Sequence, residues 1–175
     1  MTFVTINTEV ETWVTRERDP EDVWDQGDTD GRVSNVTAWI SERTEESHWY
    51  KSDSITKRFP DEVVAGTTLY AVVADYSSGC TFGRDGGHAQ VLDAFTSTQE
   101  AEALRDVALV TNTESDRWRK EYDYSFTYGD REYYRSWAGY FESLNSLDIW
   151  QVVVTTNPTN FLNRSSYGVG YKIGH

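Results

Sequence analysis

Glycines, small polar residues, an aromatic ring and an arginine converge in one short stretch of this sequence, between Tyr76 and Phe95. Its four glycines fall within nine residues of each other, at positions 79, 83, 86 and 87. Glycine accepts positive φ angles and leaves backbone amides exposed, which suits close approach to an anionic group. The runs on either side are β-patterned, and loops held between strands often carry binding sites. We therefore expect a binding loop here.

The predicted site combines this loop with residues further along the chain. Backbone amides and the guanidinium group of Arg84 would hold an anionic group, while an aromatic ring would stack on a base or ring of the ligand. The usual role of loop glycines favours an alternative, a wide hairpin loop whose glycines serve only the backbone. The predicted ligand-binding residues are Ser77, Thr81, Phe82, Arg84, His88, Arg135, Trp137 and Tyr140.

The same stretch lacks the signatures of common catalytic and nucleotide-binding loops. No Gly-Lys-Ser or Gly-Lys-Thr follows the glycines, and a strand rather than a helix comes next, which excludes the two usual phosphate-binding fingerprints. Cys80 and His88 show no sign of an activated thiol or an oriented base. The three histidines are too dispersed for a zinc site. We expect no enzyme activity, no cofactor and no metal.

A second polar stretch, Asp25–Gly31, superficially resembles a calcium-binding loop. With Gly31 at the sixth position, the first and last positions are Gln26 and Thr37. Both of the strong carboxylate ligands are therefore missing. The sequence predicts a solvated turn.

The formal net charge of −13 restricts the class of partner. Such a charge repels nucleic acid and anionic lipid, and it favours basic partners or simply solubility. We expect no direct nucleic-acid binding and no membrane binding, since no apolar run is long enough to span a bilayer. Acidic side chains gather in one polar loop, at Asp19, Glu21, Asp22, Asp25, Asp28 and Asp30.

Hydrophobic periodicity predicts one α+β domain over residues 1–175, a mostly antiparallel sheet with hairpins and one main helix packed on one face. The helix begins at the capping box Ser97–Glu100 and extends to about Val110. Gly129-Asp130 predicts a two-residue hairpin turn. We expect a short helical turn from Gly139 to about Leu147 and an irregular or mobile connection over 43–66. The predicted strands are 3–17, 33–42, 69–76, 88–95, 122–128, 133–137, 149–155 and 167–173.

Three segments together resemble a known group of proteins. They are Asp22-Val23-Trp24-Asp25 with its Asp/Thr-rich turn, the run from Tyr76 to Gly83, and the run from Trp137 to Leu144 before a valine-rich strand. This combination resembles small accessory proteins encoded by tailed bacteriophages. The resemblance implies a viral origin and a location in the host cell cytoplasm, but no particular activity. Small phage accessory proteins often act on host machinery or host immunity.

Our leading hypothesis from the sequence is a non-catalytic phage-type accessory protein that captures a host component during host takeover or against host defence. A small anionic ligand such as a nucleotide-type signal is the favoured target. One alternative is an acidic decoy that blocks a basic or nucleic-acid-binding host protein. A second alternative is a virion structural or tail-associated protein. Assembly into a homo-oligomer is left open.

Overall fold

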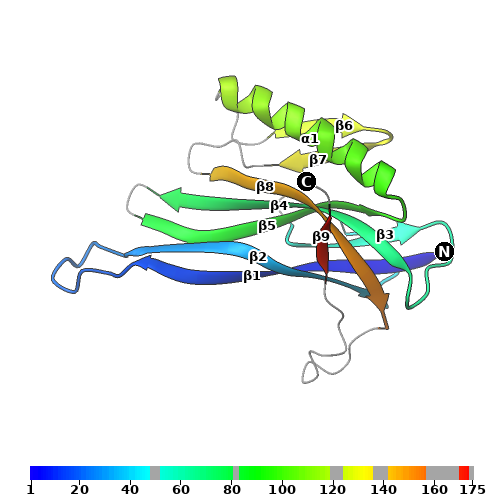
Figure 1. Cartoon of the computed structure of the whole chain (residues 1–175), viewed down its shortest axis with the longest axis horizontal. Coiled ribbons are helices and arrows are strands. Elements are labelled where there is room, and N and C mark those ends of the chain that lie inside the picture. Colours follow the sequence, from blue (N-terminus) through cyan, green and yellow to red (C-terminus); the bar gives the residue numbers. More distant parts are fainter. Residues whose placement is uncertain (48–51, 81–82, 119–123, 136–141, 157–169, 174–175) are drawn as a thin grey trace.

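The chain folds into a mostly β protein with a helix on one side, as a computed structural model shows (Figure 1). The structure describes residues 1–47, 52–80, 83–118, 124–135, 142–156 and 170–173. Side chains are described in these ranges except at 77–80, 83–86, 110–118, 124–125, 134–135, 142–143 and 171. The elements in chain order are β1 (Thr2–Arg16), β2 (Asp28–Ile40), β3 (Ser54–Phe59), β4 (Thr68–Cys80), β5 (Gly83–Phe95), α1 (Thr98–Trp118), β6 (Tyr124–Tyr128), β7 (Arg131–Arg135), β8 (Glu142–Thr155) and β9 (Tyr171–Ile173).

The main sheet curls into a nearly closed, barrel-like form. Its strand order is β3-β1-β2-β5-β4-β8-β9, and β2 also pairs with β8. Near its start β2 runs parallel to β5, with Thr29 opposite Asp85, and near its end it runs parallel to β8, with Ala38 opposite Val154. The antiparallel pairs β5–β4 and β4–β8 complete the circuit. The sheet is therefore mixed, and β2 is the strand that closes it.

Two apolar clusters lie on the two faces of this curved sheet. The inner cluster takes side chains from β1 to β5 and β8, including Ile6, Leu69 and Trp150. The outer cluster lies between the sheet and the layer formed by α1 and the β6–β7 hairpin, where Leu104 packs with Leu92 and other apolar side chains. Alternation along β4 explains both clusters, because successive side chains of a strand point to opposite faces. The helix packs on one face, as the sequence predicted.

Two glycines make the crossing of β2 over β5 possible. A Cβ atom built on Gly87 would lie 2.4 Å from the carbonyl oxygen of Gly31, and one built on Gly31 would lie 2.8 Å from the amide nitrogen of Gly87. Backbone therefore packs directly against backbone, and no side chain fits between the strands. One of the glycines that suggested a binding loop thus has a packing role.

Several sequence predictions are confirmed and others need correction. The helix follows Ser97 directly, and Gly129 occupies the predicted β6–β7 turn with φ +62°. The helix ends at Trp118, however, beyond the predicted end near Val110. The helical turn predicted from Gly139 to about Leu147 is wrong where the structure describes it, because β8 already begins at Glu142. The span 43–66, expected to be irregular, contains β3, which pairs with the first half of β1. The start of the last predicted strand lies outside the described residues.

Candidate functional site

The predicted binding loop is mostly a regular strand ladder. β4 and β5 pair from Tyr70 opposite Phe95 as far as Cys80 opposite Gly83, with irregularities after Val72 and Ser77. The wide loop expected between Tyr76 and His88 is therefore shorter than the sequence suggested. Its polar residues mostly lie within the strands that lead to the turn.

Only one of the eight predicted site residues has a described side chain. His88 is exposed, and its ring stacks on Tyr76 with 5.7 Å between ring centroids. The backbone of three others lies in strands, with Ser77 opposite Gly87, Arg84 opposite Gly79, and Arg135 opposite Tyr124. Thr81, Phe82, Trp137 and Tyr140 lie outside the described residues. Whether these eight side chains form one site therefore stays a prediction.

Among the described side chains, a dense group of titratable residues surrounds Asp93 of β5. Its carboxylate accepts a hydrogen bond from the Tyr133 hydroxyl at 2.6 Å and pairs with the Lys57 ammonium at 2.9 Å and the Arg131 guanidinium at 3.4 Å. Burial raises the pKa of Tyr133 well above its usual value, and the Asp93 carboxylate adds to the rise. The Tyr133 hydroxyl therefore acts as a hydrogen-bond donor.

The Lys57 ammonium is held from several sides at once. Its nitrogen donates to the Ala94 carbonyl at 2.6 Å and lies 4.3 Å from the centroid of the Phe95 ring. Together with the Asp93 carboxylate, these contacts engage the Lys57 ammonium within the protein. We interpret the Asp93 group as a structural junction that joins β3, β5 and β7.

A second buried carboxylate, Asp75 of β4, lies on the inner face of the sheet with only 3% of its surface exposed. One oxygen accepts a hydrogen bond from the Val33 amide of β2 at 3.1 Å, which links β4 to the strand that closes the barrel. The other oxygen makes no hydrogen bond within the described part of the chain. Burial raises the pKa of Asp75, against the smaller opposing effect of the Val33 amide.

Because the pKa of Asp75 is higher in the folded state than in the unfolded state, its contribution to stability is greatest at acidic pH. That contribution is lost as the pH rises from the usual aspartate range through the raised pKa. We expect the Asp75→Asn variant to be more stable than the wild type at neutral pH, with a smaller fall in stability between pH 4 and 8. Urea unfolding across that pH range measures the effect. Asp61→Asn, at an exposed position, is the matched control, and an identical pH profile for Asp75→Asn and wild type would contradict the prediction.

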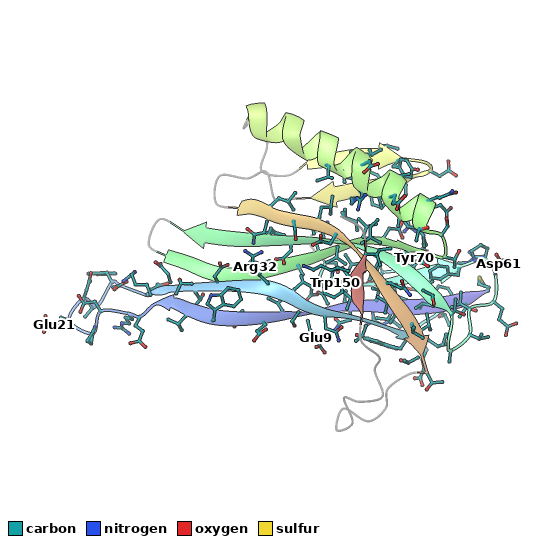
Figure 2. All side chains as sticks on the ribbon, in the orientation of Figure 1. Glu9, Glu21, Arg32, Asp61, Tyr70 and Trp150 are labelled. Atoms are coloured by element: carbon teal, nitrogen blue, oxygen red, sulfur yellow. The ribbon has the colours of Figure 1, made fainter. Side chains whose placement is uncertain are left out.

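The loop that connects β1 and β2 projects beyond the end of the β4–β5 pair, as Figure 1 shows. We call residues 9–30 the arm and residues 17–27 the arm tip. Figure 2 shows Glu21 at the far end of this projection, with Asp61 at the opposite end of the molecule. The long alternating pattern of β1 and β2 builds the arm, and the polar, proline-containing segment between them ends the strands.

One carboxylate, that of Asp25, organises the arm tip. It accepts two hydrogen bonds from the Arg16 guanidinium, at 2.7 and 2.8 Å, and one each from the backbone amides of Asp19 and Gly27, at 2.8 and 3.0 Å. The Arg16 side chain, followed by the two amides, holds the pKa of Asp25 well below its usual range. Gly27 has φ +71°, and a Cβ atom there would lie 2.7 Å from the Arg16 carbonyl oxygen. These contacts therefore hold the arm tip in a defined backbone conformation.

Two apolar side chains are displayed at the end of this loop. Trp24 is 81% exposed and Val23 is 74% exposed. Asp22 fixes the backbone beside them, because its carboxylate accepts a hydrogen bond from the Trp24 amide at 2.9 Å. The sequence indicated the acidic character of this loop, but Val23 and Trp24 were not among the predicted site residues. The sequence feature that could have identified them is two adjacent apolar residues between Asp22 and Asp25, because a polar loop offers no neighbouring apolar side chains to bury them.

Within the described residues, no group of three or more histidine, cysteine, aspartate or glutamate side chains is arranged to hold a metal ion. No helix in those ranges combines the length and the apolar character needed to cross a bilayer. Comparison with known proteins adds no assignment, since no family model, curated protein or solved structure matches the chain. The arm tip, with its apolar end and its carboxylates, is the best candidate site that the described residues offer.

Proposed function

We propose that the protein is a non-catalytic accessory protein that captures a basic protein partner through its arm. This is the acidic decoy of the sequence hypotheses, with a defined contact surface. The observation that carries the proposal is the display of Val23 and Trp24 on a loop that Asp25 already holds in shape. The loop needs no partner to form these hydrogen bonds, so binding costs little ordering entropy.

The physical case begins with the exposed apolar surface. Single exposed apolar residues are ordinary, but an adjacent pair at the end of a projecting, internally bonded loop is suited to enter a pocket. Fully burying a side chain of this size contributes about 1.5–3 kcal/mol. Tryptophan is also among the residues that most often dominate binding energy at protein interfaces. Val23 and Trp24 are therefore the expected anchors.

Charge selects the kind of partner. The arm carries nine acidic residues against two arginines, a net of −7 within a chain of net −13. Arg16 is already engaged with Asp25 and Asp28, which leaves most of the carboxylates available to face a partner. A basic surface would be attracted to the arm over a distance that depends on salt.

The other sequence hypotheses stay predictions. The small anionic ligand depends on side chains around Arg84 that lie outside the described set. The virion-associated role rests on composition alone. Neither gains support from the contacts of the described residues.

The test uses basic proteins enriched from a bacterial lysate on a cation exchanger, with the immobilised protein as bait. We expect the combined Val23→Ser and Trp24→Ala variant to weaken capture of the bound protein by about 30-fold or more, as expected for a tryptophan anchor worth at least about 2 kcal/mol. Capture by the wild type should fall sharply between roughly 0.01 and 1 M salt, where the Debye length shrinks from about 30 to about 3 Å.

Val64→Ser is the matched control, because Val64 is also an exposed valine but lies far from the arm in sequence. It should capture the same partner with unchanged affinity. Equal capture by the wild type and the arm-tip variant would remove the proposed function, as would capture that is insensitive to salt.

A further inference from the structure

The outer edge of β1 changes character part of the way along the strand. β3 pairs with β1 only from Thr2 to Asn7, opposite Phe59 and Ser54. Beyond that point β1 continues to Arg16 with β2 on one side. Among the described residues, no strand pairs with the other side of β1 from Val10 onward.

Two hydrogen bonds establish which backbone groups face this edge. The Thr8 amide donates to the Asp53 carbonyl at 3.1 Å, on the side of β1 where β3 lies. The Val33 amide donates away from β1, to Asp75, and Val33 is the residue opposite Val10. Because backbone groups alternate along a strand, the N–H and C=O groups of residues 10, 12 and 14 all point to the open edge.

The open edge lies between two irregularities in the pairing of β1 with β2, one after Glu9 and one after Val14. Natural edge strands are commonly protected by shortness, by proline, by bulges or by charge, and between these two irregularities the register from Val10 to Val14 is regular. Residues 9–15 read Glu-Val-Glu-Thr-Trp-Val-Thr, with no proline or glycine and with five β-favouring residues. Trp13 is 42% exposed and Val14 is 60% exposed. As far as the described residues show, the edge from Val10 to Val14 is thus a template for a further strand.

We propose that this edge, residues 10–14 of β1, binds an extended segment of the partner as an added strand. The inference rests on the proposed function, because it describes how the arm engages the same basic partner. Glu9, Glu11 and Trp13 share one face of β1, while residues 10, 12 and 14 share the other. Figure 2 shows Glu9 pointing away from the sheet.

The two faces specify the sequence pattern of the segment. Lysine or arginine side chains would lie opposite Glu9 and Glu11 and over the Trp13 ring, since opposite charges and cation–π contacts stabilise cross-strand pairs. Aliphatic side chains would lie opposite Val10 and Val14. The partner segment therefore alternates basic and aliphatic residues.

A second copy of this chain fits the edge less well than a basic segment does. Pairing two arms would bring two segments of net charge −7 alongside each other. Like charges directly opposite one another destabilise strand pairs. A basic segment instead neutralises the carboxylates that line the arm.

The test uses a synthetic peptide of alternating arginine and valine, seven residues long, with the full-length protein. We expect binding to slow hydrogen exchange at the amides of Val10, Thr12 and Val14. We expect Thr12→Pro to lower the affinity for the peptide at least tenfold, because proline removes the outward N–H group and obstructs the edge. Proline is tolerated at this position of an edge strand, where the N–H group does not serve the ladder to β2. Thr12→Ala keeps the N–H group and should bind normally.

Glu11→Lys is a second test that does not use proline. It should lower the affinity for the arginine–valine peptide several-fold and raise the affinity for a glutamate–valine peptide.

Equal peptide binding by the wild type, Thr12→Pro and Glu11→Lys would overturn the proposal. A dimer of the free protein that Thr12→Pro abolishes, measured by sedimentation, would overturn it in favour of a second copy. Val64→Ser, far from the arm in sequence, should bind the short peptide with unchanged affinity. Partner capture that survives Thr12→Pro but requires Trp24 would leave the proposed function in place and remove strand addition.

Discussion

Replacing Gly87 by alanine is expected to destabilise the protein by about 3 kcal/mol or more, because the added methyl group has no space. It would lie 2.4 Å from the Gly31 carbonyl oxygen, and its three nearest atoms all belong to the Gly31 backbone, which no rotamer change can move. Overpacking commonly costs 1–3 kcal/mol even where side chains can shift. For a chain of this length we expect a fall in melting temperature of about 10 °C. Thermal and urea unfolding measure both quantities.

Gly66→Ala is the matched control for this experiment. Gly66 has φ +96°, but no atom lies within 4 Å of a Cβ built there. Its replacement therefore carries the backbone strain of a positive φ angle without a steric clash, at a cost of about 1 kcal/mol. A Gly87→Ala variant no less stable than Gly66→Ala would show that β2 and β5 do not cross as closely as described.

Replacing Asp93 by alanine is the second change with a large expected effect, a loss of about 3–5 kcal/mol. The Asp93 side chain is 3% exposed, and removal of its carboxylate leaves the Lys57 ammonium without its ion-pair partner beside Phe59 and Phe95. Breaking a buried pair by removing one partner typically costs this much, because the remaining charge is uncompensated. The Tyr133 hydroxyl also loses the acceptor that holds the β6–β7 hairpin against the sheet.

A double variant separates the buried charge from the lost packing. We expect Lys57→Met combined with Asp93→Ala to recover part of the stability lost in Asp93→Ala alone, since the unpaired ammonium is gone. The measurement is a double-mutant cycle in urea. Simple additivity of the two single changes would contradict the interpretation of Asp93 as the partner of Lys57.

Local signals predicted most of the elements. Alternating apolar residues marked β1, the hairpin of β6 and β7 followed from Gly129-Asp130, and the start of α1 followed from Ser97. The wrong predictions also came from local sequence patterns. The segment from Gly139 to about Leu147, which has few β-branched residues, was predicted to form a short helical turn, yet its described part from Glu142 pairs along β4. Pairing with a long neighbouring strand outweighs such weak intrinsic preferences.

The candidate site was harder to predict than the fold. Glycines near Arg84 suggested a receptor loop, but Gly87 is explained by its contact with Gly31, 56 positions earlier in the sequence. The display of Trp24 depends on how far the arm projects, which no local pattern encodes. Asp75 and Asp93 look like ordinary aspartates in the sequence, and only their burial distinguishes them.

The sequence by itself determined the composition of each strand face, the start of the helix, the β6–β7 turn, and the concentration of negative charge in one hairpin. These follow from short-range periodicity, turn chemistry and residue counts. The tertiary structure alone decided that β2 closes the sheet between β5 and β8, that Gly31 meets Gly87, and that no described strand pairs with the outer edge of β1 after β3 ends. Such features arise from contacts between segments far apart in the chain, whose geometry depends on how the whole sheet twists and curls.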